Sequence, residues 1–287
     1  MLADHFQPGR RGLSFELFPP KTSAGEAAMY ATVQELTAFR PDFFTCTYGA
    51  GGSTRDKTLE IVARVKERFG LPVASHLTCV GTTRDQLRDY LRDAKTRGID
   101  YIVALRGDPP QGETAFKPVA GGLCYANELV ALIRGEFPGF GIAVAGYPEV
   151  HQEAPSPSAD LENLKRKVAA GADVIVTQLF YDNADYFRFV DRAREAGITI
   201  PIVPGILPIT NLAQIQRITS LCKARLPESF VAEIGRQDDA DWQFQAGVDL
   251  ATRQVSELLE RGAPGIHFYV LNKSAATAKV LEGVKWE

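Results

Sequence analysis

The chain has 287 residues, 45% of them hydrophobic and 23% charged, and its formal net charge is −3. This composition is typical of a soluble globular protein, and the absence of any block of Lys or Arg argues against nucleic acid as a partner. No apolar run could cross a bilayer and the first residues lack the apolar core of a signal peptide, so we expect a cytoplasmic protein without a membrane partner.

In chain order, the first informative segment is residues 13–21, LSFELFPPK, which predicts a short strand. Side chains alternate sides along a strand, so Leu13, Phe15 and Leu17 share one apolar face that should lie under a packing layer. Glu16 points to the other side, near the end that two prolines close because neither has an N–H to donate. Such a carboxylate is either a satisfied structural acid or a working one.

Seven more short apolar segments predict strands, and at least one helical pattern separates each strand from the next. The predicted strands after the first are 42–48, 72–79, 100–105, 141–147, 173–179, 200–206 and 265–272. The predicted helices are 22–40, one through 59–69, 84–97, 125–137, 159–170, 184–196, 212–221 and 241–261.

Alternating strands and helices indicate a parallel sheet, and eight such units predict a closed (β/α)8 TIM barrel. We expect one domain over residues 1–287, with extra helices between the last two strands. The alternative is an open doubly wound sheet, but no G-x-G-x-x-G motif follows the first strand.

In a barrel of this kind the catalytic groups gather at the carboxyl ends of the strands. Nearly every predicted strand ends in polar groups: Glu16, Thr47, His76, Arg106 with Asp108, Tyr147 with His151, Gln178, and Asn272 with Lys273. If the fourth strand stays regular, Arg106 and Asp108 lie on one side of it, and Glu16 and Asp108 could be two acids in one dry mouth. A crowded or buried carboxylate has a raised pKa and can donate a proton near neutral pH.

Each of these groups also has a purely structural interpretation. Glu16 could instead form an ion pair with Arg106, and a single His76 is more often a hydrogen-bonded core histidine than a catalyst. Glu16, His76 and Asp108 resemble a metal set, but no H-x-H or H-E-x-x-H spacing supports one, so we expect no metal. The cysteines form no C-x-x-C pair and are expected to be reduced thiols: Cys46, Cys79, Cys124 and Cys222.

The predicted helix 159–170 carries a polar stripe, because Asp160, Asn163 and Lys167 are spaced i, i+3 and i+7. An acid, an amide and a base on one face suit a ribose hydroxyl and a phosphate. By itself, an ordinary solvated helix face explains the stripe better. The glycine-rich turn 49–54 resembles a phosphate-binding loop, but its spacing fits neither a P-loop nor a dinucleotide fingerprint.

A set of short runs occurs in order between residues 13 and 273. The runs are Ser14-Phe15-Glu16 with Phe18-Pro19-Pro20, Thr47-Tyr48-Gly49-Ala50, His76-Leu77-Thr78-Cys79, Ala104-Leu105-Arg106-Gly107-Asp108, Tyr147-Pro148-Glu149-Val150-His151, Asn163-Leu164-Lys165-Arg166-Lys167, Thr177-Gln178, Pro204-Gly205-Ile206-Leu207-Pro208 and His267-Phe268-Tyr269 with Leu271-Asn272. Together they resemble the methylenetetrahydrofolate reductase family.

The resemblance implies a barrel that binds FAD at its mouth. NADH or NADPH would reduce the flavin and leave, and 5,10-methylenetetrahydrofolate would then accept hydride and become 5-methyltetrahydrofolate, in a ping-pong order. The flavin would carry the hydride chemistry. Members are often dimers or tetramers, so we expect a homo-oligomer. Because the chain ends soon after the last predicted strand, we expect no C-terminal regulatory region of the eukaryotic kind.

Position by position, the resemblance makes Glu16 the general acid that protonates folate N10 and opens the imidazolidine ring. Asp108 corresponds to an acid beside the flavin that also contacts the pterin. Positions that correspond to substrate contacts are Thr47, Asp108, Gln178, Gln214 and Lys273, the last where many members carry Arg. Positions that correspond to FAD contacts are Tyr48, Ala50, His76, Arg106, Gly107, Asp108, Tyr125, Ala126, Tyr147, His151, Asp160, Asn163, Arg166 and Lys167.

Two other functions stay open. A cofactor-free barrel lyase or transferase would use Glu16 and Asp108 as acid and base, and would be colourless. A non-catalytic flavin- or folate-binding barrel would be yellow but never bleached by NADH or NADPH.

Overall fold

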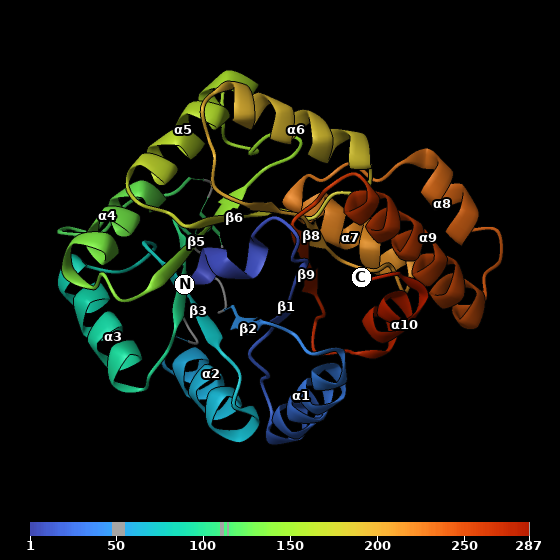
Figure 1. Cartoon of the computed structure of the whole chain (residues 1–287), viewed down its shortest axis with the longest axis horizontal. Coiled ribbons are helices and arrows are strands. Elements are labelled where there is room, and N and C mark those ends of the chain that lie inside the picture. Colours follow the sequence, from blue (N-terminus) through green and yellow to red (C-terminus); the bar gives the residue numbers. More distant parts are fainter. Residues whose placement is uncertain (48–54, 110–111, 114, 287) are drawn as a thin grey trace.

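The computed structural model describes residues 1–47, 55–109, 112–113 and 115–286. Parallel strands form a barrel with helices around the outside (Figure 1). Neighbouring strands pair in the order β7-β6-β5-β4-β3-β2-β1-β9-β8. The strands are β1 (Gly12–Leu17), β2 (Phe43–Cys46), β3 (Val73–Thr78), β4 (Tyr101–Leu105), β5 (Gly141–Gly146), β6 (Val174–Thr177), β7 (Ile202–Val203), β8 (Gly205–Ile206) and β9 (Gly265–Tyr269).

The barrel closes through a strand that is split at Pro204. Its first half, β7, pairs with β6, and its second half, β8, pairs with β9. Pro204 has no N–H to donate, but its carbonyl accepts the N–H of His267 at 3.0 Å, and the Thr177 hydroxyl accepts the N–H of Gly205 at 2.9 Å. A Cβ on Gly205 would lie 2.3 Å from the Thr177 carbonyl oxygen, so this approach requires glycine. The predicted (β/α)8 barrel is confirmed, with its seventh strand in two pieces.

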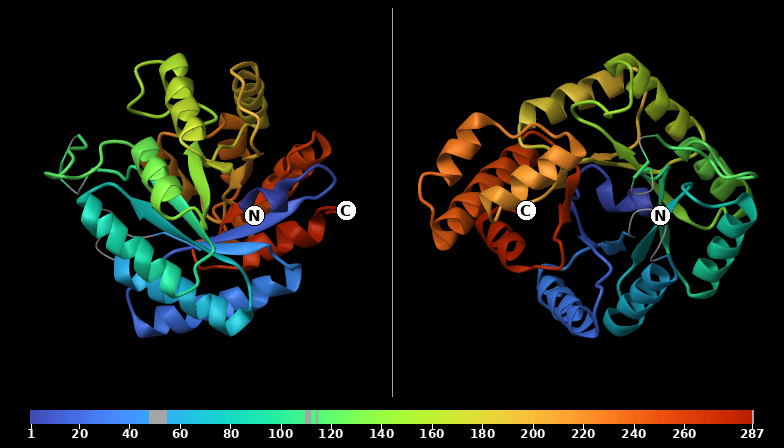
Figure 2. Two further views of the ribbon diagram at one scale, coloured as in Figure 1. Left: turned by 60° about the vertical axis from the view of Figure 1, so that its left-hand side comes forward. Right: turned by 180° about the vertical axis from the view of Figure 1, so that it is seen from behind.

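Helices separate the barrel strands as the sequence predicts, and α7, α8 and α9 group on one flank between the last two strands (Figures 1 and 2). The short helices α8 and α10 were not predicted, because seven or nine residues give little periodicity to detect. The helices are α1 (Ser23–Leu36), α2 (Arg55–Phe69), α3 (Arg84–Thr96), α4 (Ala126–Glu136), α5 (Pro157–Ala169), α6 (Asn183–Glu195), α7 (Leu212–Cys222), α8 (Glu228–Ile234), α9 (Ala240–Glu260) and α10 (Ala275–Gly283), with 3-10 turns η1 (Leu2–Phe6) and η2 (Thr37–Phe39).

The main core lies between the barrel and its helices. Leu13, Phe15 and Leu17 of β1 all belong to this core, as the alternation predicts. The ring of Phe15 packs between Phe44 of β2 at 5.4 Å and Phe268 of β9 at 6.1 Å. The other face of β1 therefore looks into the barrel, where its polar side chains lie.

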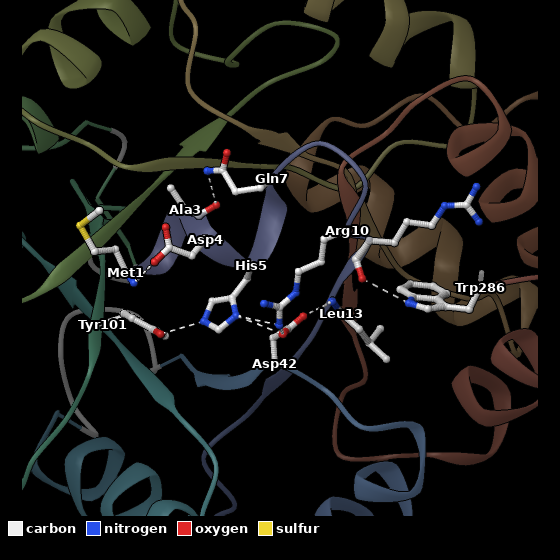
Figure 3. Close-up of polar contacts among 11 residues, drawn as sticks. Met1, Ala3, Asp4, His5, Gln7, Arg10, Leu13, Asp42, Tyr101 and Trp286 are labelled. Atoms are coloured by element: carbon white, nitrogen blue, oxygen red, sulfur yellow. Dashed lines mark hydrogen bonds and ion pairs between the residues drawn. The ribbon is translucent and has the colours of Figure 1, made fainter.

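The amino-terminal end of the barrel is closed by η1, which the sequence analysis did not predict. Its Leu2 and Phe6 are buried in a small core with side chains from the strand beginnings. His5 lies 3.0 Å from Asp42 through Nδ1 and 2.8 Å from the Tyr101 hydroxyl through Nε2 (Figure 3). This floor leaves the carboxyl end as the open end of the barrel.

A hydrogen bond joins the two ends of the chain. The indole N–H of Trp286 donates to the Arg11 carbonyl at 3.3 Å (Figure 3).

Over the described part of the chain, no helix is long and apolar enough to cross a membrane. No group of three or more His, Cys, Asp or Glu side chains within those same ranges is arranged to hold a metal ion.

Candidate active site

Four polar side chains from three strands meet inside the barrel around Glu16. Oε2 of Glu16 lies 3.2 Å from Nε2 of His76 on β3 and 3.5 Å from Nε2 of His267 on β9. The Ser14 hydroxyl lies 2.7 Å from Nδ1 of His267. These contacts form a chain Ser14–His267–Glu16–His76, and Glu16 is its most exposed member, with 18% of its side chain accessible.

The two imidazoles control the charge on Glu16. Burial alone would raise the pKa of this carboxyl, but the charge of His76 and the contacts with His267 outweigh burial and lower the pKa to about 2. The raised pKa expected from the sequence is therefore wrong. Its cause, two histidines from other strands, could not be found in the local pattern around Glu16: His267 comes from β9, which pairs with β1, and His76 comes from β3, which lies beyond β2.

His76 keeps an unsatisfied nitrogen at this site. Its Nε2 is buried and, although it is close to Glu16, it makes no well-directed hydrogen bond with any described residue. A buried polar atom without a partner costs free energy unless a ligand or water satisfies it. The nitrogen therefore fits a ligand that enters the barrel from its open end.

Asp108 does not share a dry mouth with Glu16. The strand β4 ends at Leu105, and Gly107 takes a left-handed φ of +88°, where a Cβ would lie 2.7 Å from Val80 Cγ1. The strand therefore does not continue regularly as far as Asp108, and the turn at Gly107 leaves the Asp108 side chain exposed. The expectation of two acids in one dry mouth is wrong.

Arg106 also differs from the structural alternative, because its partner is Glu153 and not Glu16. The two terminal nitrogens of Arg106 bind the two Glu153 oxygens at 2.5 and 2.7 Å. The guanidinium lies 5.1 Å from the centre of the Phe116 ring. This bidentate pair joins the segment after β4 to the loop after β5.

The polar stripe of α5 faces the end of β5. Lys167 Nζ donates to the Ala145 carbonyl at 2.6 Å and lies 6.0 Å from the centre of the Tyr147 ring. Asp160 accepts the backbone N–H of His151 at 3.0 Å, and the rings of Tyr147 and His151 meet edge to face at 4.6 Å. Two members of the stripe therefore bind the protein and are not an ordinary solvated face.

Lys167 is a cation whose charge lies in a buried part of this site. Burial lowers its pKa to about 8, against the smaller opposing effect of Asp160. Among the described residues, no carboxylate lies within ion-pair distance of its Nζ. Asn163 and Arg166, on the same helix, are exposed. An anionic group such as a phosphate would satisfy this side of the site.

The other candidates lie around the rim. Thr47 directly follows β2, and Gln178 directly follows β6 and donates its N–H to the Gly146 carbonyl at 2.8 Å. Gln214, in the first turn of α7, and Lys273, after β9, are both exposed. Tyr125 caps α4 and is 62% exposed, and Ala126 begins that helix. The remaining FAD candidates, Tyr48 and Ala50, lie outside the described residues.

A sequence model of the methylenetetrahydrofolate reductase family matches residues 1–285. This chain belongs to that family. It is 43% identical to the 5,10-methylenetetrahydrofolate reductase of Escherichia coli, over 93% of this chain and 88% of that one. It is 41% identical to the methylenetetrahydrofolate reductase (NADH) 1 of Zea mays, over 95% of this chain and 48% of the plant protein.

Solved structures agree with the barrel architecture of this member of the methylenetetrahydrofolate reductase family. An uncharacterized protein from Clostridium thermocellum that binds two copies of 5-methyl-5,6,7,8-tetrahydrofolic acid superposes with a TM-score of 0.66, at 12% identity, over 99% of this chain and 97% of that one. A dihydropteroate synthase from Coxiella burnetii gives a TM-score of 0.53 at 11% identity, over 96% and 91% of the two chains. At such low identities these structures support the fold alone.

The sequence analysis missed two side chains that the methylenetetrahydrofolate reductase fold brings to the site. His267 was noticed within a family run but not as a neighbour of Glu16, although the alternation in Gly265–Tyr269 places it on the barrel-facing side. Glu153, the partner of Arg106, lies in a loop where no periodic pattern applies. Only the second had no detectable signal.

Proposed function

We propose that this protein reduces 5,10-methylenetetrahydrofolate to 5-methyltetrahydrofolate with NADH or NADPH, in a ping-pong sequence that uses FAD. Family membership and the names of relatives at 43% identity support folate reduction. The observation that carries the mechanism is Glu16, held inside the barrel between histidines of β3 and β9. A protonatable group at this depth suits a reaction that must open a folate ring before hydride arrives.

The residues on the β5 side fit FAD. No carboxylate of the described part of the chain forms an ion pair with Lys167, which therefore suits the diphosphate, while Asp160 accepts the backbone N–H of His151 and both residues suit the polar parts of the cofactor. The candidate set is completed by Arg106, Gly107, Tyr125, Ala126, Asn163, Arg166, Tyr48, Ala50 and His76. Bound there, FAD would supply hydride transfer between the nicotinamide and the folate.

Glu16 would deliver the proton that makes folate N10 a leaving group. Its pKa of about 2, lowered by the neighbouring His76 and His267, keeps the carboxyl ionised before a substrate binds. A folate ring that displaces water from the mouth would raise the pKa of Glu16, so the carboxyl would take up a proton there and pass it to N10.

Asp108 would act by charge at the rim. Protonation and ring opening leave a cationic iminium at N5, which a nearby carboxylate stabilises. Asp108 is exposed just after the turn at Gly107, at the open end of the barrel, where a stacked pterin would lie. Thr47 and Gln178 would contact the ring systems, and the exposed Gln214 and Lys273 would contact the outer part of the folate.

An anaerobic spectrum tests the proposal directly. The purified protein should be yellow, lose its flavin absorbance when NADH or NADPH is added, and regain it with 5,10-methylenetetrahydrofolate. A colourless protein that binds no added FAD would favour the cofactor-free lyase or transferase. A yellow protein that neither nicotinamide bleaches would favour a non-catalytic binding barrel. Adding each nicotinamide in turn gives the coenzyme preference, and light scattering on the same sample tests the predicted homo-oligomer.

A further inference from the structure

The loop between α7 and α8 is bound to two other loops at the open end of the barrel. The Arg225 guanidinium donates to Asp182 at 2.8 Å and to Asp185 at 2.7 Å, both at the start of α6. The backbone N–H of Arg225 donates to both carboxylate oxygens of Glu149, at 2.9 and 3.0 Å. Glu149 lies in the loop after β5, so one residue joins three loops of the barrel.

These contacts determine how α7 runs. Its first residue, Leu212, follows the end of β8, which places the start of the helix at the carboxyl end of the barrel. Arg225, just past its last residue, contacts loops that follow β5 and β6 at the same end. The helix, about 16 Å long at 1.5 Å per residue, therefore runs along the rim of the mouth and not down the side of the barrel.

The loop after β5 carries two cofactor candidates. Glu149 stands between Tyr147 and His151, two residues from each. At the other end of the connection, α7 carries Gln214, a candidate folate contact, in its first turn. We propose that Glu149 and Arg225 are positioning residues. They fix the place of α7, which carries Gln214, relative to the loop that carries Tyr147 and His151. This inference rests on the proposed function.

Stability alone does not account for this connection. The Arg225 side chain is 52% exposed and its partner Asp182 37% exposed, and such exposed ion pairs add little to the free energy of folding, although the second partner, Asp185, is only 12% exposed. The segment is already anchored by an apolar cluster that includes Ile215 and Ile234. The polar contacts instead fix the place of a loop that follows a left-handed residue, Lys223, at the end of α7.

Kinetics of three full-length variants test the inference. Arg225→Ala and Glu149→Ala should each raise the KM for 5,10-methylenetetrahydrofolate about 5-fold, while the rate of flavin reduction and the Tm stay near wild type. Glu149→Gln keeps one acceptor oxygen for the Arg225 N–H and should fall between wild type and Glu149→Ala. The matched control is Arg253→Ala, which removes an exposed ion pair to Glu233 at 3.0 Å elsewhere on the helical flank and should change nothing.

A second measurement does not depend on activity. Amide hydrogen exchange in Leu212–Cys222 should become faster in Glu149→Ala and Arg225→Ala, but not in Arg253→Ala. Unchanged exchange, or an unchanged KM in an active enzyme, overturns the inference. Wild-type protein that reduces no folate overturns the proposed function instead, and exchange still decides whether the connection holds α7.

Discussion

The two ends of the barrel hold the same kinds of side chain, but the side chains differ in how many of their polar atoms have hydrogen-bond partners. At the floor, Asp42 receives the imidazole of His5, the guanidinium of Arg10 and the N–H of Leu13 at 2.9 Å (Figure 3). His5 uses both of its nitrogens there. At the mouth, Glu16 also meets imidazoles, but one of them keeps a buried nitrogen without a well-directed partner in the described structure.

The comparison separates a cluster that we assign to stability from the one that we propose to act in catalysis. A saturated cluster stabilises the fold, because every charge and hydrogen-bonding atom is already paired. An unsaturated cluster leaves a ligand something to bind. Residue types alone would make the two ends equally good candidates for a functional site, since each end has an acid beside histidine. Four changes test the contrast between them.

The largest effect should come from Glu16→Gln. The amide cannot donate a proton to N10, so reduction of 5,10-methylenetetrahydrofolate should fall about 10³-fold. Flavin reduction by NADH or NADPH should stay within about 2-fold, because that half-reaction needs no acid here. Stopped-flow measurement of each half-reaction checks this. Equal losses in both half-reactions would mean that Glu16 only maintains the site.

Lys167→Ala should weaken FAD binding about 10- to 100-fold, the value of one charge-assisted hydrogen bond. Fluorescence of released flavin on dilution measures the loss. Lys165→Ala is the control on the same helix, since Lys165 pairs with Glu162 at 3.3 Å on the outside. If both variants retain FAD equally, the phosphates lie elsewhere.

At the floor, Asp42→Ala should lower the free energy of unfolding by about 3 kcal/mol, because it leaves His5, Arg10 and the Leu13 N–H without their shared acceptor. Denaturant titration measures this change. Folded protein should keep its wild-type kinetics, since the floor is remote from the mouth. A variant that stays stable but loses activity would reverse the roles assigned to the two ends.

The smallest effect is the pH dependence of stability, to which Asp42 at the floor and Glu16 at the mouth contribute with the same sign. Burial would raise the pKa of Asp42, but the hydrogen bonds from His5 and Leu13 lower it below 3.8. A lowered folded pKa stabilises the protein above the unfolded value and loses that contribution as pH falls. For Glu16 the loss should span about pH 4.5 to about 2. Wild type should therefore lose more stability between pH 6 and pH 3 than Asp42→Ala, by thermal unfolding.

Local patterns predicted the features that local geometry controls. Alternation in β1 separated Phe15 from Glu16 correctly, and the spacing in α5 gathered Asp160 and Lys167 toward one place. The eight barrel units followed from counting apolar segments. Each of these features depends on residues a few positions apart, where the periods of strand and helix apply.

Features that depend on distant pairing or on single backbone angles escaped prediction. The pKa of Glu16 depends on His76 and His267, which come from other strands. Asp108 is exposed after Gly107, whose backbone takes a left-handed φ. Glycine permits this conformation, but its presence in a sequence does not show that it adopts it. The floor formed by η1 rests on contacts with strands far along the chain, and no motif marks them.

The interruption at Pro204 shortens the strand pairing on one side of the barrel. Only two register pairs join β7 to β6 and two join β8 to β9, against five between β3 and β4 and four between β4 and β5. Thermal fluctuations open a fold first where the fewest contacts hold it together. If the barrel opens locally, the shorter pairing of β7 and β8, beside Thr177 and next to the helical flank, is where we expect the opening to begin.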